Sequence, residues 1–136
     1  MKPIYKTIFI APAIIASIAI FLVSQMQHPP MINFGIEWND KLLHIIAYFF
    51  YGLSLIVLFL GGFVNIHVKR AILFVLIFGA LFAVSDEIHQ AFVPGRTSDV
   101  FDWLADCIGI SISLTLINMV NKIIQKLKLN FSRLSH

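Results

Sequence analysis

The chain has 136 residues, of which 59% are hydrophobic and 12% are charged, and its formal net charge at pH 7 is +3. A soluble domain averages roughly 45–50% apolar and about 25% charged residues, and a domain of this length has too little interior to bury the excess. The composition therefore excludes a soluble globular fold. No nucleic-acid motif accompanies the basic residues, so no nucleic-acid partner is expected.

Four apolar stretches are long enough to cross a bilayer as helices, which takes about 20 residues each. We place them at residues 8–24, 42–63, 71–87 and 100–120. The first stretch follows a basic start, as a signal peptide does, but no small-residue cleavage site comes after it, so we expect a retained helix. Pro12 is expected in the first two turns of that helix, where a proline costs little. The fold class predicted is all-α, a polytopic four-transmembrane-helix bundle forming a single membrane domain over residues 1–136.

The basic residues predict the orientation. Eight of the ten lie before the first span, between the second and third, or after the fourth: Lys2, Lys6, Lys69, Arg70, Lys122, Lys126, Lys128 and Arg133. An even number of spans puts these three groups on one side, and the positive-inside rule makes that side the cytoplasm. Both termini are therefore predicted to be cytoplasmic.

The acidic residues segregate to the other side. All seven lie in the outer loops or the outer halves of the spans: Glu37, Asp40, Asp86, Glu87, Asp99, Asp102 and Asp106. Acidic residues contribute little to topology, so their concentration there points to function.

The second span opens with the first of three polar clusters. Asn39 or Asp40 is expected to cap the helix through its short side chain. Lys41, His44 and Tyr48 follow at i, i+3 and i+7, so they lie on one helix face. Taken alone, this cluster is also explained as hydrogen bonding between helices.

The third span ends with the second cluster. If the helix continues that far, Asp86, His89 and Gln90 share a face. Glu87 then points roughly 100° away from Asp86, since a helix has 3.6 residues per turn. A solvated position in the loop is the alternative for Glu87.

The fourth span opens with the third cluster, in which Asp99, Asp102 and Asp106 again share one face. Asp99 suits the cap and the dipole of the helix N-terminus. Asp106 lies about 10 Å further along the axis, which is too deep for capping. An aspartate near the centre of a membrane helix costs about 2.5–3.5 kcal/mol and needs a partner. The cations available on that side are Lys41, His44 and Arg96.

Arg96 belongs to the turn Pro94-Gly95-Arg96 in the short outer loop. Two roles are open for it: neutralising Asp99 or Asp102, or holding an anionic head group through its planar fork of donors.

At these residues the chain resembles the VanZ-like family, which is named for a protein associated with teicoplanin resistance. Asp40, Lys41, His44 and Tyr48 match its Asp-Lys-x-x-His-x-x-x-Tyr element. The later elements are matched by Asp86, Glu87, Gln90, Pro94, Arg96, Asp102 and Gly109. Asp106 departs from the pattern, because the family more commonly has asparagine there. The resemblance implies a small protein of the bacterial cytoplasmic (inner) membrane with a link to the cell envelope and to tolerance of glycopeptide antibiotics. It does not specify an activity.

The charge of the outer side limits the functions. Seven carboxylates against Lys41 and Arg96 give a formal charge of −5 with neutral histidines. Such a cluster would repel a lipid phosphate unless carboxylates are protonated, a divalent cation binds, or the ligand is cationic.

Taken together, the clusters predict one polar cavity at the extracytoplasmic side. Its expected binding residues are Asp40, Lys41, His44, Tyr48, Asp86, Glu87, His89, Gln90, Arg96, Asp99, Asp102 and Asp106. One hypothesis is a binder of a membrane-lipid head group or a cell-wall-related ligand; a transporter of this size would need a homo-oligomer. The second is a membrane enzyme acting on a phospholipid or lipid-linked substrate, with catalytic candidates His44, Asp86, Glu87 and Asp102 and metal-ligand candidates Asp86, Glu87, Asp102 and Asp106. No established catalytic motif supports it. The third is a structural partner of an envelope complex.

Overall fold

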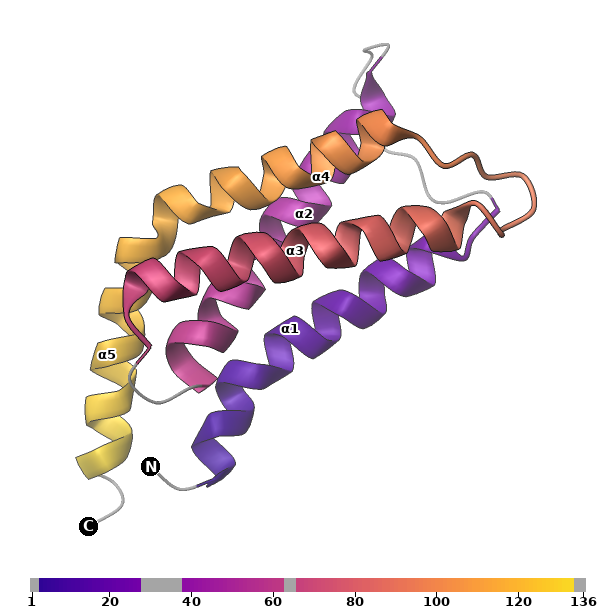
Figure 1. Cartoon of the computed structure of the whole chain (residues 1–136). Coiled ribbons are helices and arrows are strands. Elements are labelled where there is room, and N and C mark those ends of the chain that lie inside the picture. Colours follow the sequence, from indigo (N-terminus) through magenta and orange to yellow (C-terminus); the bar gives the residue numbers. More distant parts are fainter. Residues whose placement is uncertain (1–2, 28–37, 63–65, 134–136) are drawn as a thin grey trace.

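A computed structural model describes residues 3–27, 38–62 and 66–133 (Figure 1). These residues form helices and no strand, which confirms the predicted all-α fold. The elements are α1 (Pro3–Ser24), α2 (Asn39–Val57), a π-helical turn η1 (Leu58–Gly62), α3 (Val68–Gln90), α4 (Val100–Ser113), a 3-10 turn η2 (Leu114–Leu116) and α5 (Ile117–Arg133).

Within the described ranges, four helical segments are long and apolar enough to cross a membrane: Lys6–Ser24, Asn39–Gly62, Val68–Gln90 and Val100–Arg133. The last has 34 residues, about 51 Å at 1.5 Å per residue, which exceeds the hydrocarbon thickness of about 30 Å. The 3-10 turn η2 interrupts it, and α5 turns away from the axis of α4 (Figure 1). Large apolar side chains such as Ile15 and Leu81 face outward, where a bilayer would cover them.

The closest helix pair is α2 and α4, which make the most extensive contact in the described chain. Gly109 of α4 lies against the backbone of α2: a Cβ there would collide with the carbonyl oxygen of Ile45 and lie 2.9 Å from the amide nitrogen of Phe49. Gly52 of α2 lies in the same way against the backbone of α4, since a Cβ added to it would lie 3.2 Å from the Cα of Ile110. Small residues allow this approach of helix backbones within a membrane.

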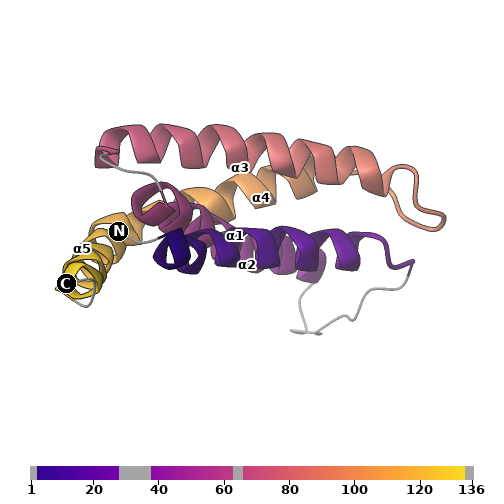
Figure 2. The same ribbon diagram turned by 90° about the horizontal axis from the view of Figure 1, so that it is seen from below.

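The other helices pack around this pair. Viewed from below, α3 runs along one edge and α1 along the other, with α4 between them (Figure 2). α3 packs mainly on α4, and α1 packs on α2 and η1. The rings of Tyr51 and Phe82 join α2 to α3, with centroids 4.6 Å apart.

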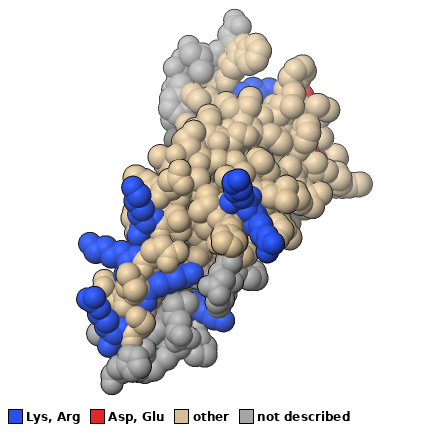
Figure 3. Space-filling view, turned by 60° about the vertical axis from the view of Figure 1, so that its left-hand side comes forward, with Lys and Arg blue, Asp and Glu red and all other residues tan. Residues whose placement is uncertain are grey.

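The start of α1 and the end of α5 lie at the same end of the molecule (Figure 1). There the ring of Phe131 meets that of Phe9, and the Nζ of Lys128 donates to the carbonyl oxygen of Leu60 at 2.7 Å. Lys and Arg side chains gather over this part of the surface (Figure 3). Lys2 and Glu37 lie outside the described residues.

Three sequence-based expectations about helix ends are wrong. α1 begins at Pro3, so Pro12 lies in the helix interior and not in its first two turns. The apolar pattern begins later than the helix because polar residues such as Lys6 are helical too. α2 begins at Asn39 after Trp38, which makes no side-chain cap, so Asn39 and Asp40 lie inside the first turn. Asp40 there favours the helix through its dipole. The fourth helical stretch continues beyond residue 120 to Arg133. The sequence-based end is placed too early because the last part of the helix is amphipathic and carries too many charges to be recognised as part of an apolar span.

We predict that Gly109→Ala destabilises the protein by about 1–3 kcal/mol, because the added methyl group forces α4 away from the backbone of α2. Unfolding of the purified protein in detergent, followed by tryptophan fluorescence, measures the change. Ile108→Ala is the matched control, since this neighbouring side chain faces outward. Equal stability of Gly109→Ala and the native protein would contradict the close packing described here.

Candidate functional site

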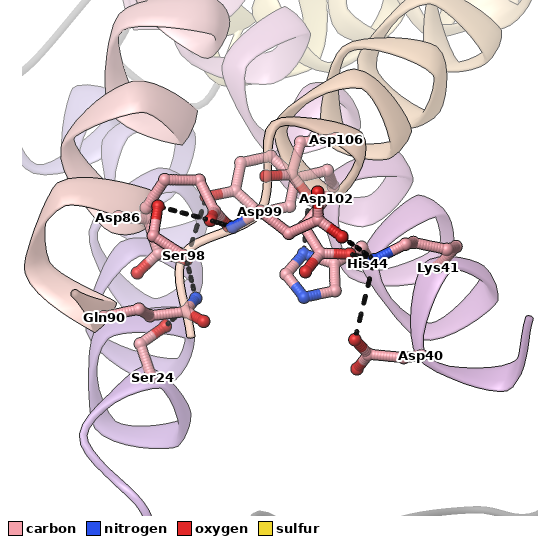
Figure 4. A network of polar contacts seen from close by, with 12 residues as sticks. Ser24, Asp40, Lys41, His44, Asp86, Gln90, Ser98, Asp99, Asp102 and Asp106 are labelled. Carbon is pink, nitrogen blue, oxygen red and sulfur yellow. Dashed lines mark hydrogen bonds and ion pairs between the residues drawn. The ribbon is translucent and has the colours of Figure 1, made fainter. Parts of the chain in front are cut away.

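Lys41 on α2 joins two carboxylates at the start of α4 (Figure 4). Its Nζ donates to Oδ2 of Asp99 at 2.8 Å and to Oδ1 of Asp102 at 2.5 Å. The Asp102 side chain is only 6% exposed, so this ammonium compensates a buried charge. Asp40 is exposed and lies 4.0 Å from the same Nζ, where an ion pair contributes little.

Asp99 also caps α4, as the sequence predicts, because its Oδ1 accepts the backbone N–H of Phe101 at 2.9 Å. The Lys41 ammonium and this N–H hold the pKa of the Asp99 carboxyl below its usual value, so the cap is charged at neutral pH. The expectation that Arg96 neutralises Asp99 or Asp102 is wrong, because Lys41 occupies that position.

His44, one turn after Lys41, meets the next carboxylate along α4. Its Nδ1 lies 2.9 Å from Oδ1 of Asp106. The Asp106 side chain is fully buried, with no exposed area. The depth of Asp106 predicts a cationic partner for it, and in the structure the imidazole of His44 lies in that position.

Asp86 lies at the centre of a second set of contacts, which reaches α1. Its Oδ2 accepts hydrogen bonds from the hydroxyl of Tyr48 at 3.2 Å and from the side-chain amide of Gln90 at 3.1 Å. The same Gln90 amide lies 3.5 Å from the Oγ of Ser24 on α1, a weak hydrogen bond at most. The side-chain oxygen Oε1 of Gln90 accepts from Nη2 of Arg96 at 2.5 Å. Gln90 thereby connects α3 to the outer loop.

Glu87 fixes the segment that leads into α4. Its Oε2 accepts the backbone N–H of Asp99 at 3.0 Å and the hydroxyl of Ser98 at 3.3 Å. The residue is 6% exposed, so a solvated position in the loop is ruled out. Gly95 in this loop has φ of 82°, a left-handed conformation that glycine adopts without strain.

His89 is the predicted site residue that joins none of these contacts. It shares the outer end of α3 with Asp86 and Gln90, but its ring packs against that of Phe21 on α1, with centroids 4.9 Å apart. Two residues that sequence reasoning missed are Ser24 and Ser98. Ser24 is a lone hydroxyl at the outer end of the first span, and only its membrane depth could have indicated it.

Two groups of side chains could hold a metal ion. In each group the donor atoms lie within 4.8 Å of one another: Asp40, His44 and Asp102 in one, and His44, Glu87 and Asp106 in the other. Asp86, a candidate ligand from the sequence, belongs to neither group among the described residues.

A cavity of about 450 Å³ lies between α1 and α2, beside the network of polar contacts described above. We call it the α1–α2 cavity. Most of its wall is apolar and comes from the two helices, including Ala19, Val23, Leu43, Ala47 and Phe50. Its polar lining is formed by Ser24, Asp40, His44, Tyr48, Asp86, Gln90 and Arg96. The volume is within the usual range for ligand pockets, which is roughly 300–1,000 Å³.

A family model described as VanZ/LLP1 matches residues 7–121 of the chain. That range includes all four spans in part or in full and every residue of the network. Comparison with curated proteins and with solved structures found no match.

We predict that Lys41→Met destabilises the protein by about 1–3 kcal/mol, because Asp102 keeps a buried charge without its ammonium partner. The double variant Lys41→Met with Asp102→Asn should recover part of this loss, since the buried charge is gone. Unfolding by denaturant in mixed micelles measures both. Asp40→Asn is the control and should change stability by less than about 0.5 kcal/mol. No recovery in the double variant would show that the ion pair is not the cause.

Proposed function

The chain belongs to the VanZ-like family of membrane proteins, and we propose that it binds a phosphate-bearing envelope lipid at the extracytoplasmic side. The acyl chain lies in the α1–α2 cavity and the head group lies at its polar end. The observation that carries this proposal is the composition of that cavity, which combines an apolar wall with one set of convergent polar groups.

The walls of the α1–α2 cavity suit an acyl chain that enters from the bilayer. Several lining side chains are also exposed on the outer surface of the helices, among them Ala19, Ala47 and Phe50. The cavity therefore reaches the face that lipid would cover, and a lipid can enter sideways. A second hollow of about 650 Å³ is lined by side chains such as Ile14, Leu55 and Phe78 and by the hydroxyl groups of Ser17, Tyr51 and Ser85. No charged side chain lines it among the described residues, so it offers a phosphate no ionic partner.

The polar end of the α1–α2 cavity suits a head group that combines a phosphate with a hydrogen-bond donor. Among the described residues, the hydrogen bond of the Arg96 side chain goes to Gln90 through Nη2 alone, which leaves its other N–H groups for a phosphate. Asp40 and Asp86 line the same cavity and accept hydrogen bonds. With neutral His44, these three charged groups sum to −1, which disfavours a purely anionic head group.

A zwitterionic lipid therefore fits better than an anionic one. Its phosphate pairs with Arg96, and its ammonium pairs with the exposed carboxylate of Asp40. A lipid-linked cell-wall precursor shares the phosphate and offers sugar hydroxyls in place of the ammonium. Either ligand would connect the protein to the envelope, and through it to teicoplanin tolerance.

We also propose that the protein lies in the bacterial cytoplasmic membrane with both termini in the cytoplasm. The support is the separation of charge: Lys128, Arg133 and the other basic residues of α5 lie at the end shared with the start of α1, while Lys41 and Arg96 alone among the described lysines and arginines lie at the acidic end. Loops rich in lysine and arginine stay in the cytoplasm.

Binding of phosphatidylethanolamine to the purified protein should fall about tenfold or more in Arg96→Gln, since losing a charge-assisted contact to phosphate costs roughly 1.5–3 kcal/mol. Ala47→Phe should weaken binding as well by filling the cavity. Native mass spectrometry with phosphatidylethanolamine, phosphatidylglycerol and an undecaprenyl-pyrophosphate lipid measures the affinities.

The controls for this experiment are Arg70→Gln, at the opposite end, and Leu76→Phe, an outward-facing residue of α3. Both should bind as the native protein does. Preference for the pyrophosphate lipid would identify a cell-wall ligand, whereas equal binding of all three lipids by every variant would refute a specific site.

A reporter fused after the last residue tests the orientation. Green fluorescent protein should fluoresce there, and alkaline phosphatase should be inactive, because both report on the side of the membrane they reach. Phosphatase inserted after Gly95, in the outer loop, is the matched control and should be active. An active phosphatase at the C-terminus would overturn the proposed orientation.

A further inference from the structure

Three helices each contribute one side chain to a group of possible metal ligands that adjoins the α1–α2 cavity. His44 comes from α2, Glu87 from α3 and Asp106 from α4, and their donor atoms lie within 4.8 Å of one another. We call this group the His44 trio. Glu87 and Asp106 are buried and the His44 side chain is 12% exposed, so the trio lies inside the bundle (His44 and Asp106 are labelled in Figure 4).

Both carboxylates of the trio have one oxygen without a hydrogen-bond partner among the described residues. On Asp106, Oδ1 meets the imidazole and Oδ2 has no partner. On Glu87, Oε2 takes two donors and Oε1 has none. Glu87 is 6% exposed and Asp106 is fully buried, so neither oxygen faces bulk solvent. A buried carboxylate oxygen without a partner is costly, and in native proteins it calls for an explanation.

The surrounding charges do not compensate for it. Lys41 is paired with Asp99 and Asp102. Arg96 donates to Gln90 and pairs with neither carboxylate of the trio among the described residues. His44 is therefore the one basic side chain in contact with the two carboxylates among the described residues. With both carboxyl groups ionised, even a protonated imidazole would leave the trio with one uncompensated negative charge.

We propose that the His44 trio binds a divalent transition-metal ion. The ion would take the unpartnered carboxylate oxygens and an imidazole nitrogen as ligands, and its charge would balance both carboxylates. Imidazole suits Zn²⁺, Fe²⁺ and their neighbours, whereas Mg²⁺ and Ca²⁺ prefer oxygen ligands throughout. Three protein ligands leave a coordination position for water or a bound ligand.

The other group of donors, Asp40, His44 and Asp102, is a weaker site. Asp40 is exposed, and Oδ1 of Asp102 already accepts from the Lys41 ammonium. A cation there would compete with Lys41. The two groups share His44, so Asp40→Asn separates them.

Metal titration of the purified full-length protein in detergent, stripped with a chelator, tests the proposal. Mn²⁺ is followed by electron paramagnetic resonance, and Zn²⁺ by competition with it. We expect one saturable Mn²⁺ site with nitrogen coupling from an imidazole. Binding should weaken at least about tenfold in Glu87→Gln and in Asp106→Asn, both of which keep the shape of the side chain. Asp40→Asn should bind as the native protein does.

Melting temperatures distinguish a folded variant that no longer binds the metal from a variant that does not fold. Mn²⁺ should raise the melting temperature of the native protein and of Asp40→Asn, but not that of Glu87→Gln or Asp106→Asn. No saturable binding by the native protein, or unchanged binding in both trio variants, overturns the proposal. Loss of binding in Asp40→Asn with normal binding in Glu87→Gln also overturns it, in favour of the other group. The site does not rest on lipid binding, so Arg96→Gln should bind Mn²⁺ normally even where it no longer binds lipid.

Discussion

The direct contact between the backbones of α2 and α4 is the constraint on which the rest of the structure depends. Gly109 and Gly52 remove the side chains that would hold the two helices apart. The approach brings one face of α2 onto one face of α4, so Lys41 reaches Asp102 and His44 reaches Asp106 one turn deeper. A wider separation would leave these carboxylates in apolar surroundings without a cation. The glycine that closes the family pattern therefore has a packing role that makes the ion pairs attainable.

The contacts of the network explain how so small a bundle accommodates several carboxylates at one end. Each buried carboxylate is compensated in a different way: Asp102 by an ammonium, Asp86 by two neutral donors and Glu87 by a hydroxyl and a backbone N–H. Because Lys41 and Tyr48 donate from α2 to acids on α4 and α3, the contacts that satisfy these acids also hold the helices in place. Asp106 has only an imidazole as its partner, and two buried carboxylate oxygens, Oδ2 of Asp106 and Oε1 of Glu87, have no hydrogen-bond partner among the described residues.

Asp106 is also where the chain departs from the family pattern it resembles. An asparagine at that depth brings no charge and could supply its own donor to a neighbouring acid. The aspartate adds a second buried carboxylate opposite Glu87, and with it a need for a cation. The proposed metal site follows from that difference in side-chain chemistry, whereas the proposed lipid site rests on Arg96 and the α1–α2 cavity. The two sites adjoin at His44, which lines the cavity and belongs to the trio.

The sequence by itself determined the class of fold, the number of spans and which residues gather at the acidic end. Composition and span length follow from the cost of exposing backbone and charge to lipid, and these quantities are local. The i, i+3, i+7 spacings also determined which side chains share a helix face. Only the tertiary structure decided the partners, because contacts between helices depend on how closely and in what register two backbones meet. In the tertiary structure Lys41, and not Arg96, pairs with Asp99 and Asp102. The ring of His89 packs on Phe21, and Ser24 of α1 lies beside the amide of Gln90. The Lys41 contacts depend on Gly52 and Gly109, whose effect is visible only when the helix opposite each of them is in place.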